Sequence, residues 1–328
     1  MLERSDLRGA DGVPADVLQS TQPVVMRGLV RDWPMVQAAQ RSDAEFCTYL
    51  RGFGEQTRLA LWHGGPEIGG RFFYNSDFSG FNFRHEIQPF GALLDALLAH
   101  TADALYLGST EVDSAFPGLR QHNDLAALAG LHPHVSLWLG NRTQVAPHFD
   151  LPDNIACVVA GRRRFTLFPP DQVANLYIGP LDLTPAGQPI SLVDTAQPDL
   201  ERFPRYAQAL EHAQIVELEP GDALFLPSQW WHGVESLGPI NGLVNFWWRQ
   251  SPPFMDTPLN TLMMALLSVR DLPLVQRDAW RALFDHYVFD ADDQTAAHIP
   301  PAARGILAPM NDASARQLRT LLQNRLKR

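Results

Sequence analysis

The sequence predicts a mostly β protein with some α, a sandwich or small barrel followed by a helical region. Three observations lead to this fold class. The middle of the chain consists of short β-rich runs separated by glycine, proline and acidic turn signals. One of these runs alternates apolar with other side chains, as a strand with one buried face does. Towards the end of the chain, the apolar residues instead take the spacing of amphipathic helices.

The residues ahead of the β region predict a mixture of strands and helices. The segment from Pro23 to Pro34 is expected to form a short strand, a turn and the first residues of a helix. A helix is expected over residues 43–54, because its apolar residues have helical spacing and its last residue is glycine. The run "ALYLGS" at residues 104–109 predicts a further strand.

The core strands are expected between about residues 104 and 250. In "HVSLWLG", the side chains of Val135, Leu137 and Leu139 alternate with Ser136 and Trp138, which predicts a half-buried strand. The other predicted strands lie in "NIACVVAG", "RFTLFPPD", "QIVELEPGDALFLP" and "GLVNFWWRQ". A Pro-Gly-Asp turn divides the third of these runs into two strands.

The chain is expected to divide into a β domain over residues 1–253 and a helical region over residues 254–328. Thr257 is a suitable N-cap, and Pro258 suits the first turn of a helix. Two apolar stripes in this region must be buried against something. They comprise Leu259, Leu262, Met263 and Leu266, and then Leu318, Leu321, Leu322 and Leu326. Packing on the β domain would bury them; we favour a homodimer, because the stripes come last in the chain.

The composition indicates a globular protein that binds neither nucleic acid nor a membrane. The 328 residues include 36 acidic and 26 basic side chains, whereas nucleic-acid-binding proteins usually have a basic surface. The most apolar late run, "LNTLMMALLSV", is too short to span a bilayer. The first residues lack the apolar centre of a signal peptide, and Cys47 and Cys157 are expected to be free buried thiols. We expect a cytoplasmic protein.

The motif "PHFD" at residues 147–150 is the first candidate for a functional site. His148 and Asp150 are separated by one residue, and side chains at i and i+2 of a strand point to the same face. Both can therefore reach one point while Phe149 faces the opposite layer. A buried carboxylate is costly unless it is paired or bound to a metal. An isolated His-x-Asp pair is more often structural than metal-binding, so the motif needs a third ligand.

His232 is the best candidate for that third ligand. It follows the turn "EPGD" and the strand "ALFLP", where the end of a sandwich or barrel is expected. Two imidazoles and one carboxylate make the facial triad of non-haem Fe(II) oxygenases, which leaves positions open for a cosubstrate and O₂. We expect ordinary surface or packing roles for the other histidines, which are His63, His85, His100, His122, His132, His134, His212, His286 and His298.

The order and spacing of these motifs resemble the cupin-like branch of the JmjC-domain 2-oxoglutarate oxygenases, which includes an asparaginyl hydroxylase. The resemblance extends from about Pro23 to Gln250 and rests on "PVVMRGLVRDWP", "YLGS", "PHFDLPDNIACVVAGRRRFTLFPPDQVANLY", "LERFP", "EPGDALFLPSQWWHGVES" and "VNFWW". It implies a double-stranded β-helix, the cupin or jelly-roll fold, with eight core strands. It also implies a dioxygenase that uses Fe(II), 2-oxoglutarate and O₂ to hydroxylate a protein side chain, a peptide or a small molecule.

The resemblance also implies roles for individual residues. It makes His148, Asp150 and His232 the iron ligands. Arg163 in "AGRRRF" takes the place of a basic residue that pairs with the distal carboxylate of 2-oxoglutarate, and Tyr106 that of a tyrosine that hydrogen-bonds the same carboxylate. The asparaginyl hydroxylase has lysine where this chain has arginine, which can still form a bidentate pair with a carboxylate.

Further positions match or depart from the family pattern. Asn154 and Asn245 match asparagines near the metal and cosubstrate, and Trp247 matches a tryptophan of the pocket wall. Without the resemblance, Tyr106 and Trp247 could equally be core aromatics, and Asn154 a turn residue. Val145 replaces a threonine that contacts the cosubstrate, a loss of one hydrogen bond worth roughly 0.5–1.5 kcal/mol. Gly108 replaces a glutamine that touches the protein substrate, so the same substrate is not assumed.

Two segments are expected to shape the substrate site. Residues 169–211 form a long polar segment with several prolines and glycines, which suits a lid and a solvent-exposed crossover equally well. Residues 69–83 mix aromatic residues with glycine and asparagine, as a pocket wall or a packed loop does. Arg162 and Arg164 are interpreted as surface charges that flank the basic position.

Two other functions remain open. A cupin can hold another divalent metal as an isomerase or hydrolase, although many such cupins use a His-x-His motif with a nearby glutamate, which this chain lacks. The protein could also be a non-catalytic dimeric binding scaffold. A scaffold, however, gains nothing from clustering two histidines and an aspartate.

Overall fold

The structure is a computed structural model that describes residues 1–5, 7 and 12–327. It divides into two compact units, Met1–Arg249 and Gln250–Arg328, which are described separately. The first unit contains a nine-stranded and a four-stranded sheet.

The larger sheet contains the N-terminal strands and half of the core strands. They are β1 (Leu2–Arg4), β2 (Val24–Met26), β3 (Arg58–Gly64), β4 (Arg84–Pro89), β5 (Ala104–Glu111), β6 (His134–Gly140), β8 (Asp153–Ala160), β11 (Ala223–Leu226) and β13 (Asn241–Trp248). Their order across the sheet is β1-β2-β11-β8-β13-β6-β5-β3-β4. The smaller sheet has the order β10-β9-β12-β7, with β7 (Gln144–His148), β9 (Arg163–Phe168), β10 (Gln214–Leu218) and β12 (Trp231–Ser236).

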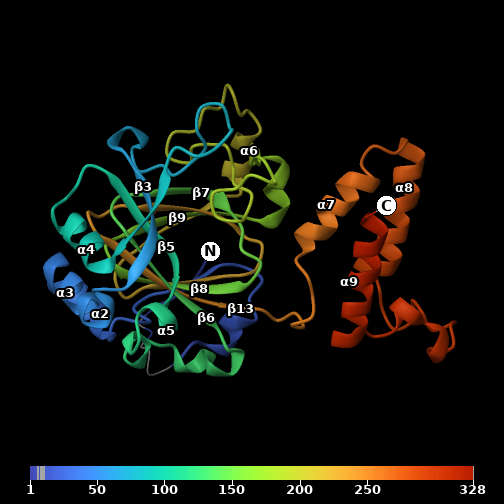
Figure 1. Cartoon of the computed structure of the whole chain (residues 1–328), viewed down its shortest axis with the longest axis horizontal. Coiled ribbons are helices and arrows are strands. Elements are labelled where there is room, and N and C mark those ends of the chain that lie inside the picture. The colour runs from blue at the N-terminus through green and yellow to red at the C-terminus, as the bar shows by residue number, and fades with distance from the viewer. Residues whose placement is uncertain (6, 8–11, 328) are drawn as a thin grey trace. The chain divides into compact units, whose positions relative to one another are not determined.

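The eight strands from β6 to β13 form the double-stranded β-helix. The chain passes repeatedly between the sheets, so that β6, β8, β11 and β13 belong to the larger sheet and the other four to the smaller one. Every pairing among these eight strands is antiparallel. Figure 1 shows β7 and β9 in one layer and β6, β8 and β13 in the other. The predicted cupin fold is confirmed, as a sandwich: in the described residues the two sheets do not close into one barrel.

Helices cover the outer face of the larger sheet. α2 (Pro34–Arg41), α3 (Asp43–Gly54) and α4 (Phe90–Leu98) contribute their buried side chains to one apolar cluster with the strands, and Cys47 and Cys157 are free thiols in that cluster. The predicted helix over residues 43–54 is confirmed, and the Ser42 side chain caps it by accepting a hydrogen bond from the Glu45 backbone N–H. Shorter helices complete this unit, namely α1 (Ala15–Leu18), α5 (Val112–Ala115) and α6 (Tyr206–Glu211).

The core strands are covered on both faces. β8 is almost continuously buried, because helices pack on one side of it and the smaller sheet on the other. The prediction of a half-buried strand over residues 134–140 was therefore wrong for its second face. Leu137 and Leu139 point into the helix-covered cluster, but Ser136 is also buried, and Trp138 lines a pocket between the sheets.

The second unit consists of α7 (Pro258–Ser268), α8 (Leu274–Phe284) and α9 (Asp312–Leu326) with short turns between them. The Thr257 side chain caps α7 as predicted. Within the described part of this unit, Ala315 is the only buried residue. In the predicted apolar stripes, Leu262, Met263, Leu321 and Leu322 each expose between 41% and 46% of their surface, whereas Leu259, Leu266 and Leu318 are half-buried. No helix of the described chain is both long and apolar enough to cross a membrane.

Candidate metal centre

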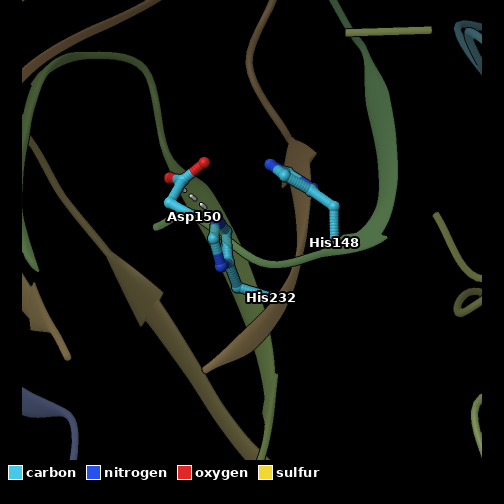
Figure 2. Close-up of side chains that lie close together, drawn as sticks. All are labelled: His148, Asp150 and His232. Atoms are coloured by element: carbon cyan, nitrogen blue, oxygen red, sulfur yellow. Dashed lines mark ion pairs between the residues drawn. The ribbon is translucent and has the colours of Figure 1, made fainter. Parts of the chain in front are cut away.

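Three predicted ligands come together at one end of the smaller sheet. His148 is the last residue of β7 and lies opposite His232 of the antiparallel strand β12. Asp150 lies two residues beyond the end of β7, so its approach results from the turn after the strand rather than from strand alternation. Each residue offers a ligand atom within 4.8 Å of the others. Figure 2 shows the three side chains pointing toward one another.

Backbone carbonyls hold both imidazoles in position. The Nδ1 atom of His148 lies 3.0 Å from the Ala146 carbonyl oxygen, and that of His232 lies 2.9 Å from the Trp230 carbonyl oxygen. Each Nδ1–H therefore donates to the backbone, which leaves Nε2 with a free lone pair for a metal. Phe149, which was predicted to face away from the two ligands of its motif, packs edge-on against Trp231. Their ring centroids are 4.9 Å apart.

The electrostatics favour the neutral form of His232. Burial, together with the neighbouring His148, lowers the pKa of His232 to about 4, although the carboxylate of Asp150 acts in the opposite direction. The Asp150 carboxylate lies 3.6 Å from the Nε2 atom of His232. Neutral imidazole is the form that binds metals. Among the described residues, no other group of three histidine, cysteine or acidic side chains meets in this way.

A buried cation lines the same pocket as the three ligands. Arg163 begins β9 and is only 2% exposed, and its Nε and Nη2 atoms have no hydrogen-bond partner among the described residues. The Tyr106 side chain lies next to this guanidinium. Burial lowers the pKa of Arg163, and Tyr106 partly opposes that effect. A buried guanidinium with unused donors fits a ligand carboxylate, as the cosubstrate of the resemblance requires.

The predicted asparagines and tryptophan also lie in this pocket. The indole N–H of Trp138 donates to Asn245 over 2.8 Å, and the Asn245 amide lies 3.5 Å from the side-chain oxygen of Asn154. The indole nitrogen of Trp247 is buried without a partner among the described residues. Val145 lines the pocket as well.

Several pocket residues were not predicted individually. Trp62 of β3 and Trp138 belong to the wall, and so do Phe72 and Gln188. The last two come from segments 69–83 and 169–211, whose composition had indicated substrate contact. Segment 169–211 is also partly buried, because Leu176 and Val193 pack with strand residues in a separate apolar cluster.

The basic residues beside Arg163 lie on the surface, as predicted. Arg164 forms an ion pair of 2.7 Å with Glu217, and Arg162 approaches the same carboxylate at 3.4 Å. These pairs are solvent-exposed and contribute little to stability. Arg163 thus differs from its two neighbours because only its side chain points between the sheets.

The fold and the site together define a cupin-type protein with a two-histidine, one-carboxylate cluster able to bind a metal. Comparison with known proteins agrees. The family model described as "Cupin-like domain" matches residues 10–254, and the chain belongs to this family. JmjC-type members of the family use Fe(II) and 2-oxoglutarate.

Curated relatives match a shorter part of the chain. A lysine-specific demethylase JMJ31 from Arabidopsis thaliana is 32% identical over 129 residues, which are 38% of this chain and 23% of the relative. HSPB1-associated protein 1 from Homo sapiens is 38% identical over 114 residues, 34% of this chain and 23% of the relative. tRNA wybutosine-synthesizing protein 5 from Danio rerio is 34% identical over 109 residues, 33% of this chain and 30% of the relative. The chain thus matches less than a third of the length of these relatives.

Proposed function

We propose that the protein is an Fe(II)- and 2-oxoglutarate-dependent dioxygenase. The observation that supports this most strongly is that one pocket contains both a facial cluster of two histidines and an aspartate and a buried, partly unpaired Arg163. The cluster suits iron, and the guanidinium suits the distal carboxylate of 2-oxoglutarate.

Each side chain has a distinct task in this proposal. His148, Asp150 and His232 would hold the metal, with both imidazoles fixed by their Nδ1 hydrogen bonds. Arg163 and Tyr106 would anchor the cosubstrate and so orient its keto acid end toward the metal. Bound iron supplies O₂ activation, which converts 2-oxoglutarate and O₂ to succinate and CO₂ and places one oxygen atom on a substrate C–H bond. The apolar wall around the site limits access of water.

We propose hydroxylation of a side chain, peptide or small molecule as the outcome. Demethylation begins with the same hydroxylation step and differs only in that the oxidised carbon is bonded to nitrogen. Support for a stable hydroxylated product comes from the resemblance to the asparaginyl hydroxylase. Demethylation is the alternative outcome, because one of the relatives is named as a lysine-specific demethylase.

An anaerobic titration tests the proposal. Fe(II) and 2-oxoglutarate added to the metal-free protein should produce the visible metal-to-ligand charge-transfer band of the chelate. His148→Ala, which removes one ligand, should not produce it. If the metal binds but no band appears, the dioxygenase is wrong, and an isomerase, a hydrolase or a binding scaffold becomes the better hypothesis.

We also propose that residues 1–253 form the oxygenase domain and that the helical region 254–328 pairs two copies of the chain. The support is that the helices expose part of their apolar stripes while burying one residue in the described part of their unit. A cytoplasmic location is proposed because Cys47 and Cys157 are free thiols, which a reducing compartment preserves.

A further inference from the structure

The wall of the pocket holds few charges. Among the described residues that line it, Asp150 and Arg163 are the only acidic or basic side chains apart from the two histidines of the metal cluster. The proposed function assigns the first to the metal and the second to 2-oxoglutarate. No charged side chain of this wall then remains for the substrate. A charged substrate group would lose its hydration there without gaining a partner of opposite charge, which is unfavourable.

Besides the buried indole N–H of Trp247, the wall offers the half-buried amide of Gln188 to a substrate. Trp138 and Asn245 are already hydrogen-bonded to each other at 2.8 Å. Gln188, by contrast, reaches the pocket from segment 169–211 and is half-buried, and no hydrogen bond found among the described residues involves its amide. A primary amide both donates and accepts. It therefore matches an uncharged amide, hydroxyl or carbonyl group better than it matches an ion.

The remaining wall consists of aliphatic and aromatic side chains, and several of the aromatic rings pack on other rings. Phe83, which does not itself line the pocket, stacks on the wall residue Trp62 with ring centroids 4.7 Å apart and an interplanar angle of 11°. Phe72 stacks on Tyr106 at 5.8 Å and 29°. Each of these rings gives one face to a neighbour, whereas a cage for a methylated ammonium group needs several ring faces directed at the same point.

We propose that the substrate inserts an uncharged group into this pocket and that the amide of Gln188 is the hydrogen-bonding contact that orients and selects it. The inference rests on the proposed function, because that function assigns Asp150 and Arg163 to the metal and the cosubstrate. It excludes the side chains of lysine and methylated lysine as the group that enters.

Paired probes of nearly equal shape and different charge test the selection. The probes are capped single amino acids and capped pentapeptides in which the central residue is asparagine or aspartate, glutamine or glutamate, and norleucine, lysine or trimethyllysine. The full chain is loaded with Fe(II) and 2-oxoglutarate without oxygen. Binding is followed by tryptophan fluorescence, since Trp62, Trp138 and Trp247 line the pocket. The charge-transfer band, recorded before any probe is added, shows separately whether the proposed function holds.

The expected result is a neutral probe that binds at least tenfold more tightly than its charged partner. Gln188→Ala should weaken binding of that neutral probe about tenfold, and Gln188→Glu should shift the ratio at least tenfold toward the lysine probe. The matched control is Gln197→Ala, an exposed glutamine of the same segment that does not line the pocket, and it should leave the ratio unchanged. A ratio measured within one variant does not depend on the fraction of folded protein.

Three results would overturn the inference. They are a charged probe that binds as tightly as its neutral partner, a preference that Gln188 substitutions do not alter, and the absence of binding by every neutral probe. Each can occur while the charge-transfer band is present, so each is distinguishable from failure of the proposed function.

Discussion

Replacing Arg163 with methionine should change stability and cosubstrate binding in opposite directions. The guanidinium is 2% exposed, and two of its nitrogen atoms have no hydrogen-bond partner among the described residues. In the unliganded protein, these N–H donors are removed from water without gaining a hydrogen-bond acceptor. Methionine is an unbranched side chain, shorter than arginine, and has no polar group to satisfy. The substitution therefore removes an unfavourable feature of the unliganded protein and, at the same time, the proposed partner of a ligand carboxylate.

The size of both effects follows from the contacts. Each unpaired buried donor costs about 1–3 kcal/mol, and the loss of the partner of Tyr106 cancels roughly one such contribution. The free energy of unfolding of the metal-free protein should then rise by about 1–3 kcal/mol. Leaving a buried carboxylate without its cation costs about 2–5 kcal/mol, which corresponds to a roughly 30- to 4,000-fold weaker affinity for 2-oxoglutarate.

Two measurements on the same variants check this prediction. Denaturant unfolding of the metal-free protein gives the stability, and titration of the anaerobic charge-transfer band with 2-oxoglutarate gives the affinity. Arg162→Met is the matched control, because that side chain is exposed and makes only a long ion pair with Glu217, so neither quantity should change appreciably. If Arg163→Met unfolds more easily and binds 2-oxoglutarate unchanged, Arg163 is a structural residue and the assignment fails.

Three further predictions address other parts of the chain. Val145→Thr restores a hydroxyl in the pocket wall and should tighten 2-oxoglutarate binding by about two- to tenfold, the value of one hydrogen bond, in the same titration; unchanged or weaker binding would show that the hydroxyl finds no partner. Burial opposes the charged form of His63, but its hydrogen bonds to Glu86 and Asp103 outweigh that effect and raise its pKa. The resulting stability is present below the unfolded pKa of about 6.5 and should be lost as the pH rises through the higher folded value, so denaturation curves of His63→Gln should lack this decline; an equal decline in both proteins would contradict it. Leu322→Asp should convert a dimer into a monomer in sedimentation experiments, whereas a native chain that is already monomeric would refute pairing through the helical region.

The core of the fold was predictable because each of its strands ends in a local signal. The Pro-Gly-Asp turn at residues 220–222 separates β10 from β11, as expected, and the glycine after β8 ends that strand at Ala160. The burial of the second face of β6 was not predictable in this way. Ser136 and Trp138 are covered by elements that lie far away along the sequence. The residues next to them in sequence therefore do not indicate that they are covered.

The candidate site likewise contains residues that the sequence indicates and residues that it does not. His148 and Asp150 are neighbours in sequence, so a motif could propose them together, and the turn and strand that precede His232 indicated it as the third ligand. Trp62 and Gln188 enter the pocket from a strand ahead of the core and from a long irregular segment. Nothing in their immediate sequence distinguishes them from packing or solvent-exposed residues. Only the folded chain identifies them as part of the wall.

The same pocket contains two features that are each unfavourable in the unliganded protein. One is a cluster in which burial holds His232 neutral beside a carboxylate, and the other is the incompletely paired Arg163. A scaffold that never binds a metal or an anion would be more stable with apolar residues at these positions. The two features require different ligands, a metal and a carboxylate, and 2-oxoglutarate can contact both at once through its two ends. Their presence in one pocket therefore favours the dioxygenase over a non-catalytic scaffold, and also over a cupin that binds a metal alone.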